Sequence, residues 1–285
     1  MIKQKTIQKE AVYKGIGLHT GNPSNLRFLP APANAGVTFI RVDLPGKPAI
    51  PARIENVIGV IRGTSLGANG AQVHTVEHVC SALLGLGIDN VIVELDANEP
   101  PVADGSSKPF LDALIAAGAV EQDAPKKMFS VTEPVTYQMN ESEIKLEPGE
   151  GLEIHCRLIY DHPMIGKQEG VFHVTPENYA REIAPARTFC FDYEVEALKR
   201  KGLARGGSLD NAVVIGMDRI HNKEKKLRYP DEFIRHKILD FLGDLFLLGK
   251  TVSGKITAVK IGHGHNTNFV KELNKINALG EVAHG

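Results

Sequence analysis

The sequence predicts an α+β protein of two domains with similar topology, each a β-sheet layered against helices. Short β-rich runs precede helical patterns, and this order occurs twice along the 285 residues. A polar, proline-containing stretch at residues 121–127 separates the two halves. The hydrophobic content of 42% is sufficient for two cores. We therefore expect domains at residues 1–125 and 126–285, with a site formed between them.

The first half begins with two β-rich runs, at residues 25–29 and 37–42, which are punctuated by glycine and proline. A helical spacing of apolar residues follows at 75–86. A strand-like run at 90–95 and a second helical pattern at 107–117 complete this half. The order predicts a sheet that is covered by helices.

The second half repeats the order of strands followed by helices. We expect strands at residues 129–138, 143–146, 152–158, 171–175, 212–215 and 255–261, and helices at 231–248 and from about 267 to 278. Because strands precede helices in both halves, two α+β domains fit better than one doubly wound parallel sheet.

Charge and cysteine usage exclude several classes of function. Lys and Arg number 33 against 34 Asp and Glu, so no overall field attracts nucleic acid or an anionic membrane surface. Cys80, Cys156 and Cys190 are an odd number of widely spaced cysteines in apolar stretches. This pattern favours buried reduced thiols over a disulfide framework, and therefore a reducing compartment.

The chain carries no pattern typical of export or membrane insertion. The N-terminal residues MIKQKTIQKE lack the apolar core of a signal peptide. The most apolar later stretch, residues 238–248, is interrupted by Asp240 and Asp244, so no transmembrane segment is expected. We predict a soluble, cytoplasmic protein without an obligatory protein partner.

The predicted helix at 231–248 carries a polar stripe on an otherwise apolar surface. His236, Asp240 and Asp244 are spaced at i, i+4 and i+8, which places them on one face among apolar neighbours. Buried carboxylates cost several kcal/mol each unless they are paired or bound to a metal. A metal site satisfies this requirement, and so does a core His–Asp ion pair with Asp244 capping a loop. The helix alone leaves both interpretations open.

The segment TVEH, residues 75–78, adds a histidine and a glutamate at a predicted helix start. Neighbouring helical residues point roughly 100° apart, so Glu77 can approach a water molecule while His78 binds the metal. His78, His236 and Asp240 would be three ligands of a zinc ion whose fourth position holds water. The pattern predicts a zinc hydrolase in which Glu77 is the general base.

The segment IGHGHNTN, residues 261–268, is predicted as a strand end that enters a glycine-bearing turn with two histidines. A histidine near the metal and close to Asp244 would be kept protonated, as an acid for the leaving amine or a positive charge for the oxyanion. A solvent-exposed turn is the alternative. Lys237 is either a solvated helix charge or a contact for an anionic substrate, and periodicity leaves both open.

Seven motifs run in order over nearly the whole chain: GIGLHTG (15–21), TVEH (75–78), DGSS (104–107), ARTFCF (186–191), GGSLDNAVV (206–214), HKILDFLGD (236–244) and GHGHN (262–266). In this combination the chain resembles the UDP-3-O-acyl-N-acetylglucosamine deacetylases of lipid A biosynthesis. The resemblance implies two similar domains, each with a small insert and the active site between them. It implies a zinc ion, with ferrous iron as the alternative metal, and a UDP-linked acylated amino sugar that loses acetate from its 2-acetamido group.

The resemblance also implies site residues. It assigns the metal ligands to His78, His236 and Asp240, the base to Glu77, and the catalytic histidine to His263 with Asp244 beside it. His265, two residues on, competes for the last role. It further implies an oxyanion contact at Thr188, substrate contacts at Phe189 and Phe191, and a contact to the nucleotide-linked part of the substrate at Lys237. The acyl chain would lie in an insert at about residues 192–216, lined by Ala197, Leu198, Leu203, Ala212 and Val214.

Three other functions compete with this interpretation. His74, Glu77 and His78 spell H-x-x-E-H, the signature of a class of metallopeptidases, which would recruit His74 as a ligand. Two histidines and a carboxylate are also the ligand set of non-haem iron oxygenases, but these need no base beside the metal. A metal that merely clamps two domains of a binding module would need a closed shell of four ligands. The first alternative leaves HKILD and GHGHN without a role.

Overall fold

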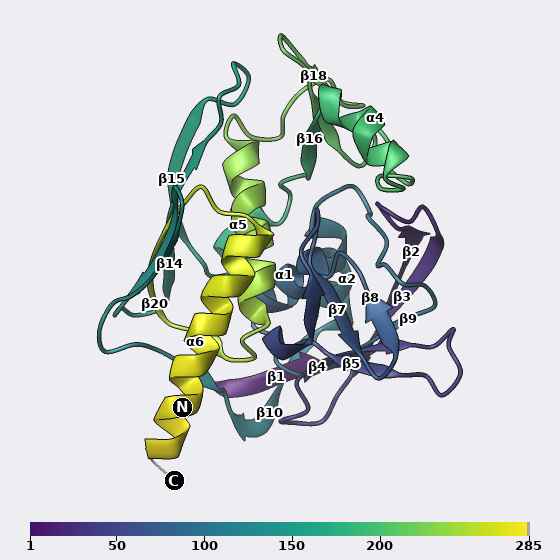
Figure 1. Ribbon diagram of the computed structural model, residues 1–285. Helices are drawn as coiled ribbons and strands as arrows, with labels where there is room; N and C mark the ends of the chain where they lie inside the picture. The colour runs from purple at the N-terminus through teal and green to yellow at the C-terminus, as the bar shows by residue number, and fades with distance from the viewer. Residues whose placement is uncertain (284–285) are drawn as a thin grey trace.

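Two five-stranded sheets form the outer layers of the protein and the main helices lie between them (Figure 1). The computed structural model describes residues 1–283, with side chains to residue 278. The first sheet has the order β2-β3-β9-β4-β5. Its strands are β2 (Ala11–Ile16), β3 (Pro23–Pro30), β4 (Val37–Arg41), β5 (Ala49–Pro51) and β9 (Val91–Leu95).

The second sheet repeats the first strand for strand, with the order β12-β13-β20-β14-β15. Within each sheet all neighbours are antiparallel except one pair, β4 with β9 and β14 with β20. The strands are β12 (Val135–Met139), β13 (Ser142–Glu147), β14 (Leu152–Ile159), β15 (Lys167–His173) and β20 (Gly254–Val259). The predicted α+β class with two similar sheet-and-helix layers is confirmed.

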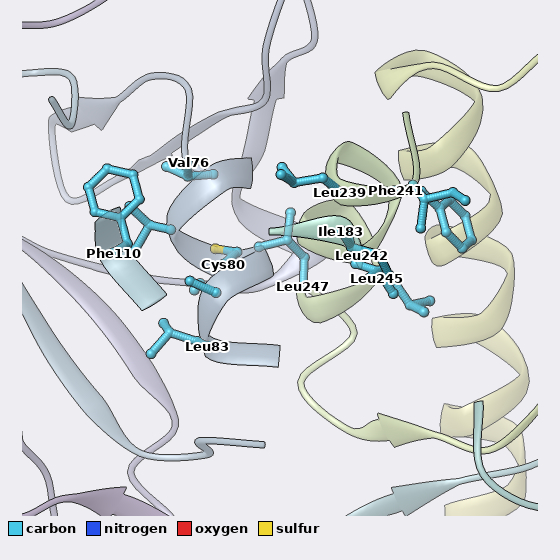
Figure 2. Close-up of a cluster of buried hydrophobic side chains, with 14 of the residues drawn as sticks. Val76, Cys80, Leu83, Phe110, Ile183, Leu239, Phe241, Leu242, Leu245 and Leu247 are labelled. Atoms are coloured by element: carbon cyan, nitrogen blue, oxygen red, sulfur yellow. The ribbon is translucent and has the colours of Figure 1, made fainter. Parts of the chain in front are cut away.

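Each sheet has a pair of helices, one before and one after its last strand in the chain, and the first helix of each pair, the inner helix, packs against its counterpart at the centre of the molecule. These are α1 (Glu77–Leu86) and α2 (Lys108–Ala117) for the first sheet, and α5 (Glu232–Phe246) and α6 (His263–Ala283) for the second. Figure 2 shows Val76, Cys80 and Leu83 of the α1 region between Phe110 of α2 and the leucines of α5. Burial of this shared apolar surface fixes α1 against α5.

Each half carries an insert at the same point of its topology, between its last edge strand and its inner helix. The first insert contains the 3-10 helix η1 (Ile54–Asn56) and a sheet of β6 (Val57–Gly59), β7 (Ser65–Ala68) and β8 (Ala71–Val73). The second contains β16 (Phe189–Phe191), α4 (Asp192–Arg200), β17 (Val213–Ile215) and β18 (Ile220–His221). α4, β16 and β18 lie together at the top of Figure 1, near the start of α5.

Short elements connect these layers. β1 (Lys3–Ile7) pairs with β10 (Ala119–Pro125), and β11 (Met128–Phe129) pairs with β19 (Thr251–Val252). The helical turns α3 (Pro176–Asn178) and η2 (Tyr179–Ile183) lead from β15 toward the second insert. All three cysteines are free; Cys80 and Cys156 are buried, and Cys190 is half-buried.

Several predicted boundaries were wrong. The single strand expected at 129–138 is two strands, β11 and β12, because the intervening residues include Pro134, which donates no ladder hydrogen bond. The strand expected at 171–175 begins at Lys167, where it continues the antiparallel pairing with β14. The helix expected from residue 75 begins at Glu77, since Thr75 has a φ of 54°.

A glycine allows the two central helices to approach closely. A Cβ atom on Gly243 of α5 would collide with the backbone carbonyl of Glu77 at the start of α1. We expect Gly243→Ala to lower the unfolding free energy of the metal-free protein by about 1–3 kcal/mol, because α1 must move away from α5. Urea unfolding measures this effect. Gly264→Ala on α6 is the control, because its added methyl group would meet only Val60, at 3.9 Å; equal losses in both variants would contradict the prediction.

Candidate metal centre

Glu77 and His78 are the first two residues of α1 and both side chains are buried. The left-handed backbone at Thr75 turns the chain sharply from β8 into the helix. The Val76 amide then donates a hydrogen bond to the Thr64 carbonyl, at 3.1 Å. This turn directs the start of α1 at the middle of α5.

His236 and Asp240 face His78 from α5. The Asp240 Oδ1 atom lies 3.3 Å from His236 Nε2 and 3.7 Å from His78 Nε2. One ligand atom from each of these three residues lies within 4.8 Å of the other two. All three side chains are buried. Residues far apart in the sequence therefore converge in one cluster of two imidazoles and one carboxylate.

The cluster has the chemistry of a zinc site. His236 Nδ1 lies 3.0 Å from the Ala186 carbonyl, to which it donates a hydrogen bond, so Nε2 points toward Asp240 with its lone pair free. Burial lowers the pKa of His236 to about 4, which keeps the ring neutral. Burial alone would raise the pKa of Asp240, but His236, Lys237 and His263 lower it well below its ordinary value. Two imidazoles and a carboxylate suit a tetrahedral zinc ion with one open position.

The Glu77 carboxylate lies beside the cluster rather than among its three residues. Its Oε2 atom accepts a hydrogen bond from the Thr64 amide at 2.9 Å, and its Oε1 atom lies 3.8 Å from His263 Nε2. Burial raises the pKa of Glu77. A raised pKa suits a carboxylate that must accept a proton near neutral pH.

His263 is the first residue of α6. The prediction that GHGHN forms a turn was therefore wrong, because residues 263–266 form the first turn of this helix. His263 Nδ1 lies 2.9 Å from Asp244 Oδ2, and this carboxylate also accepts hydrogen bonds from Thr64 and Asn266. Burial would lower the pKa of His263, but the carboxylates of Asp244, Asp240 and Glu77 raise it to about 10. The ring is therefore protonated at neutral pH.

The helical turn separates the two histidines of GHGHN. Residues two apart on a helix point about 200° from one another, so His265 faces away from the cluster. Its Nδ1 atom lies 3.5 Å from the hydroxyl of Tyr137, and it does not contact Asp244. Only His263 of this pair lies beside Asp240 and Glu77.

Lys237 is not a solvated helix charge. Its side chain is 17% exposed, and Nζ donates a hydrogen bond to Asp240 Oδ2 at 3.0 Å. The ammonium group also lies 5.4 Å from the centre of the Phe189 ring. Lys237 therefore places a cation at the edge of the cluster.

A cavity of about 270 Å³ opens beside Phe189. Leu198, Ala212 and Val214, three of the five residues predicted to line the acyl-chain insert, line it together with Thr188. Leu18, His19 and Arg62 from the first half complete the wall. The other two predicted residues, Ala197 and Leu203, are not among its lining residues. Phe191, which was predicted as a substrate contact, packs against Tyr160 and His162.

Sequence reasoning missed some contacts of the site. Thr64 bonds both Glu77 and Asp244, but its surroundings, RGTSL, carry no recognisable pattern. Asn266 lies three residues after His263, and a helical interpretation of GHGHN would have placed both on one face. His74 lies outside the cluster, since its Nδ1 atom pairs with Ser65 Oγ at 2.9 Å. Its position does not fit an H-x-x-E-H metal site.

Fold and site together fit a class of protein: the hydrolytic zinc enzymes, since a cluster of two histidines and one carboxylate on two packed helices could hold the ion, with a separate carboxylate and histidine beside it. The particular family is given by comparison with known proteins. The model of the LpxC family, UDP-3-O-acyl N-acetylglycosamine deacetylase, matches residues 4–275. The chain belongs to this family, whose members are zinc-dependent amidohydrolases of lipid A biosynthesis, as the sequence predicted.

Relatives from several bacteria match over nearly the whole chain. The UDP-3-O-acyl-N-acetylglucosamine deacetylase of Bdellovibrio bacteriovorus is 44% identical over 273 residues, covering 96% of this chain and 90% of the relative. The enzyme of the same name from Saccharophagus degradans is 45% identical over 277 residues, covering 96% and 91%. That of Myxococcus xanthus is 43% identical over 270 residues, covering 95% and 86%.

Two further expectations concern the surroundings of the protein. Within residues 1–283, no helix combines the length and apolar composition that crossing a membrane requires. Separately, family membership agrees with the predicted cytoplasmic location.

Proposed function

We propose that this chain hydrolyses the 2-acetamido group of a UDP-3-O-acyl-N-acetylglucosamine at a zinc ion held by His78, His236 and Asp240. The observation that carries the proposal is the convergence of these three buried side chains from α1 and α5. When bound, zinc would polarise the acetamido carbonyl and lower the pKa of water to about 7. The three protein ligands would leave the fourth tetrahedral position of the zinc ion open for water or substrate.

Glu77 and His263 would handle the protons. Glu77 lies beside the ligand cluster with a raised pKa, so its carboxylate takes a proton from the attacking water. His263, held by Asp244, carries its positive Nε2–H toward the same space. It stabilises the negative charge that develops on the carbonyl oxygen and donates a proton to the leaving amine. Acetate and the free amine are the products.

The remaining site residues would bind the substrate. The cavity beside Phe189 takes the acyl chain, and Thr188 at its inner wall contacts the oxyanion. Lys237 supplies a cation for the nucleotide-linked part of the substrate. Phe189 and Phe191, which both pack against Tyr160, supply aromatic contacts. Residues 1–125 and 126–285 would be the two domains, since each contains one complete sheet with its helices.

Metal analysis coupled to an acetate-release assay tests this proposal. The purified protein is expected to bind about one zinc ion per chain and to release acetate from UDP-3-O-acyl-N-acetylglucosamine. A chelator should abolish the release, and added zinc or ferrous iron should restore it. Full activity in a metal-free sample would refute the proposal.

The two histidines of GHGHN offer a matched comparison. We expect His263→Ala to lower kcat by about 10²-fold or more, because the charge that faces the carbonyl oxygen is lost. His265→Ala should retain nearly the full rate, since its ring contacts Tyr137 instead. Steady-state kinetics gives kcat for both variants. A larger loss of kcat in His265→Ala than in His263→Ala would make His265 the catalytic histidine.

Filling the cavity should separate acyl binding from hydrolysis. Ala212→Phe places a ring where the chain would lie, so KM for a long-chain substrate should rise by at least about tenfold, given roughly 0.8 kcal/mol per displaced methylene. A substrate that lacks the acyl chain should be hydrolysed as fast by the variant as by the wild type. Equal effects on both substrates would place the acyl chain elsewhere.

A further inference from the structure

Glu99 is a buried carboxylate outside the metal cluster and only 1% exposed. It lies in the segment NEPP that follows β9. Its two oxygens accept hydrogen bonds from two separate parts of the chain. Thr75 Oγ1 donates at 2.8 Å; the His19 amide donates at 3.0 and 3.1 Å, and Thr20 donates through its amide and its hydroxyl, both at 2.8 Å. A buried carboxylate is stable only when it is bonded in this way, so Glu99 ties these segments together.

The bond to Thr75 acts on a residue in an unfavourable conformation. A β-branched residue with a φ of 54° is an outlier, and it persists only where the surrounding structure holds it. Glu77 and His78 follow two and three residues later, at the start of α1. The direction in which the chain leaves Thr75 therefore sets where both side chains lie.

The bonds to His19 and Thr20 act on the wall of the cavity. Leu18 and His19 line it, and their carbonyls accept hydrogen bonds from Gly206 at 3.0 Å and Arg205 at 3.2 Å of the second insert. A Cβ on Gly17 would collide with Glu99, so the loop lies directly on the carboxylate. Glu99 thus contacts both the cavity wall and the turn that carries the base and a metal ligand.

We propose that Glu99 is a positioning residue with two separable effects: through Thr75 it aligns Glu77 and His78, and through His19 and Thr20 it holds the cavity wall. The inference rests on the proposed roles of Glu77 and His78. The Thr75 contact governs kcat, since it fixes the reacting groups. The contact with the loop governs KM for the acylated substrate, since the loop forms part of the binding wall.

The test uses the zinc-loaded enzyme, with kcat expressed per bound zinc and the melting temperature recorded for each variant. Thr75→Val keeps the shape of the side chain but removes its hydroxyl group. It should lower kcat about tenfold, which corresponds to the loss of one hydrogen bond, and leave KM within about twofold of the wild-type value. Thr75→Ser keeps the hydroxyl and should stay within about twofold of wild type in both constants. Glu99→Ala should lower kcat about tenfold and also raise KM severalfold, because both contacts are lost.

Glu99→Gln is the conservative rescue. Its single oxygen can accept the amides of His19 and Thr20 while its NH₂ group donates to Thr75 Oγ1, so both constants should return close to wild type. If Thr75→Val and Glu99→Ala lower only the melting temperature while kcat per bound zinc is unchanged, the proposal is overturned. If Glu99→Ala fails to fold, Thr75→Val against Thr75→Ser decides alone. A wild-type rate in Glu77→Gln would instead refute the proposed function.

Discussion

Replacing Glu77 with glutamine is expected to lower kcat by about 10²–10⁴-fold while the zinc content stays unchanged. The carboxylate lies beside the cluster of His78, His236 and Asp240, so its loss should remove the proposed proton acceptor and leave the three proposed ligands in place. Its raised pKa reflects burial, and the uncharged amide cannot take over the proton. Acetate release per bound zinc measures the effect.

The glutamine variant also preserves the local structure. The Thr64 amide donates to Glu77 Oε2, and the oxygen of glutamine can accept the same bond. A loss of rate therefore cannot be assigned to collapse of the turn before α1. Glu77→Ala, which removes both oxygens, should show the same rate loss with a lower melting temperature. Loss of zinc in both variants would make Glu77 a ligand and not the base.

Local patterns in the sequence were sufficient for the parts of the site that lie on one helix. The spacing of His236, Asp240 and Asp244 predicts a single buried stripe on α5, and the structure contains it, because helical periodicity depends only on neighbouring residues. The contact of His78 with this stripe cannot be predicted from helical periodicity. It depends on the packing of α1 against α5, for which Gly243 provides the space. The chemistry of TVEH beside the stripe predicted that His78 joins His236 and Asp240, and the resemblance to a family implied the same three residues.

The GHGHN segment shows how a tertiary contact overrides local propensity. Its two glycines disfavour a helix and favour a turn. The structure starts α6 there, because Asn266 donates to the buried Asp244 carboxylate and the Thr267 hydroxyl donates to the His263 carbonyl. Propensity cannot reveal the bond between Asn266 and Asp244, since Asp244 lies on another helix. The resemblance favoured His263 over His265, and the helix places His263 beside Glu77 and Asp240.

The repeated topology explains where the cavity forms. Each insert lies between the last edge strand of its sheet and the inner helix, and the inner helices α1 and α5 pack against each other. The two inserts thereby meet, and Arg62 of the first forms an ion pair with Glu194 of the second. Residues of the second insert form most of the cavity wall, while Leu18, His19 and Arg62 come from the first half. The composition of either half alone could not predict a wall built from both.

His236→Ala and Asp240→Asn are each expected to weaken zinc binding by more than about 10²-fold, since even outer contacts of a metal site contribute 10–100-fold. Asp240 lies within reach of both imidazoles, and His236 is oriented by the Ala186 carbonyl, so each residue is preorganised for its proposed role as a ligand. Titration with a competing chelator measures the affinity.

Asp244→Asn on the same helix is the matched control, because Asp244 contacts His263, Thr64 and Asn266 but is not one of the three clustered ligands. It should retain zinc even where activity falls. A second measurement follows from linkage: a ligand that binds only the folded state raises stability by about 2.7 kcal/mol at a hundredfold excess over its Kd. Zinc should therefore raise the melting temperature of wild type and Asp244→Asn but not of His236→Ala. Zinc-dependent stabilisation of all three proteins would mean that the ion binds elsewhere.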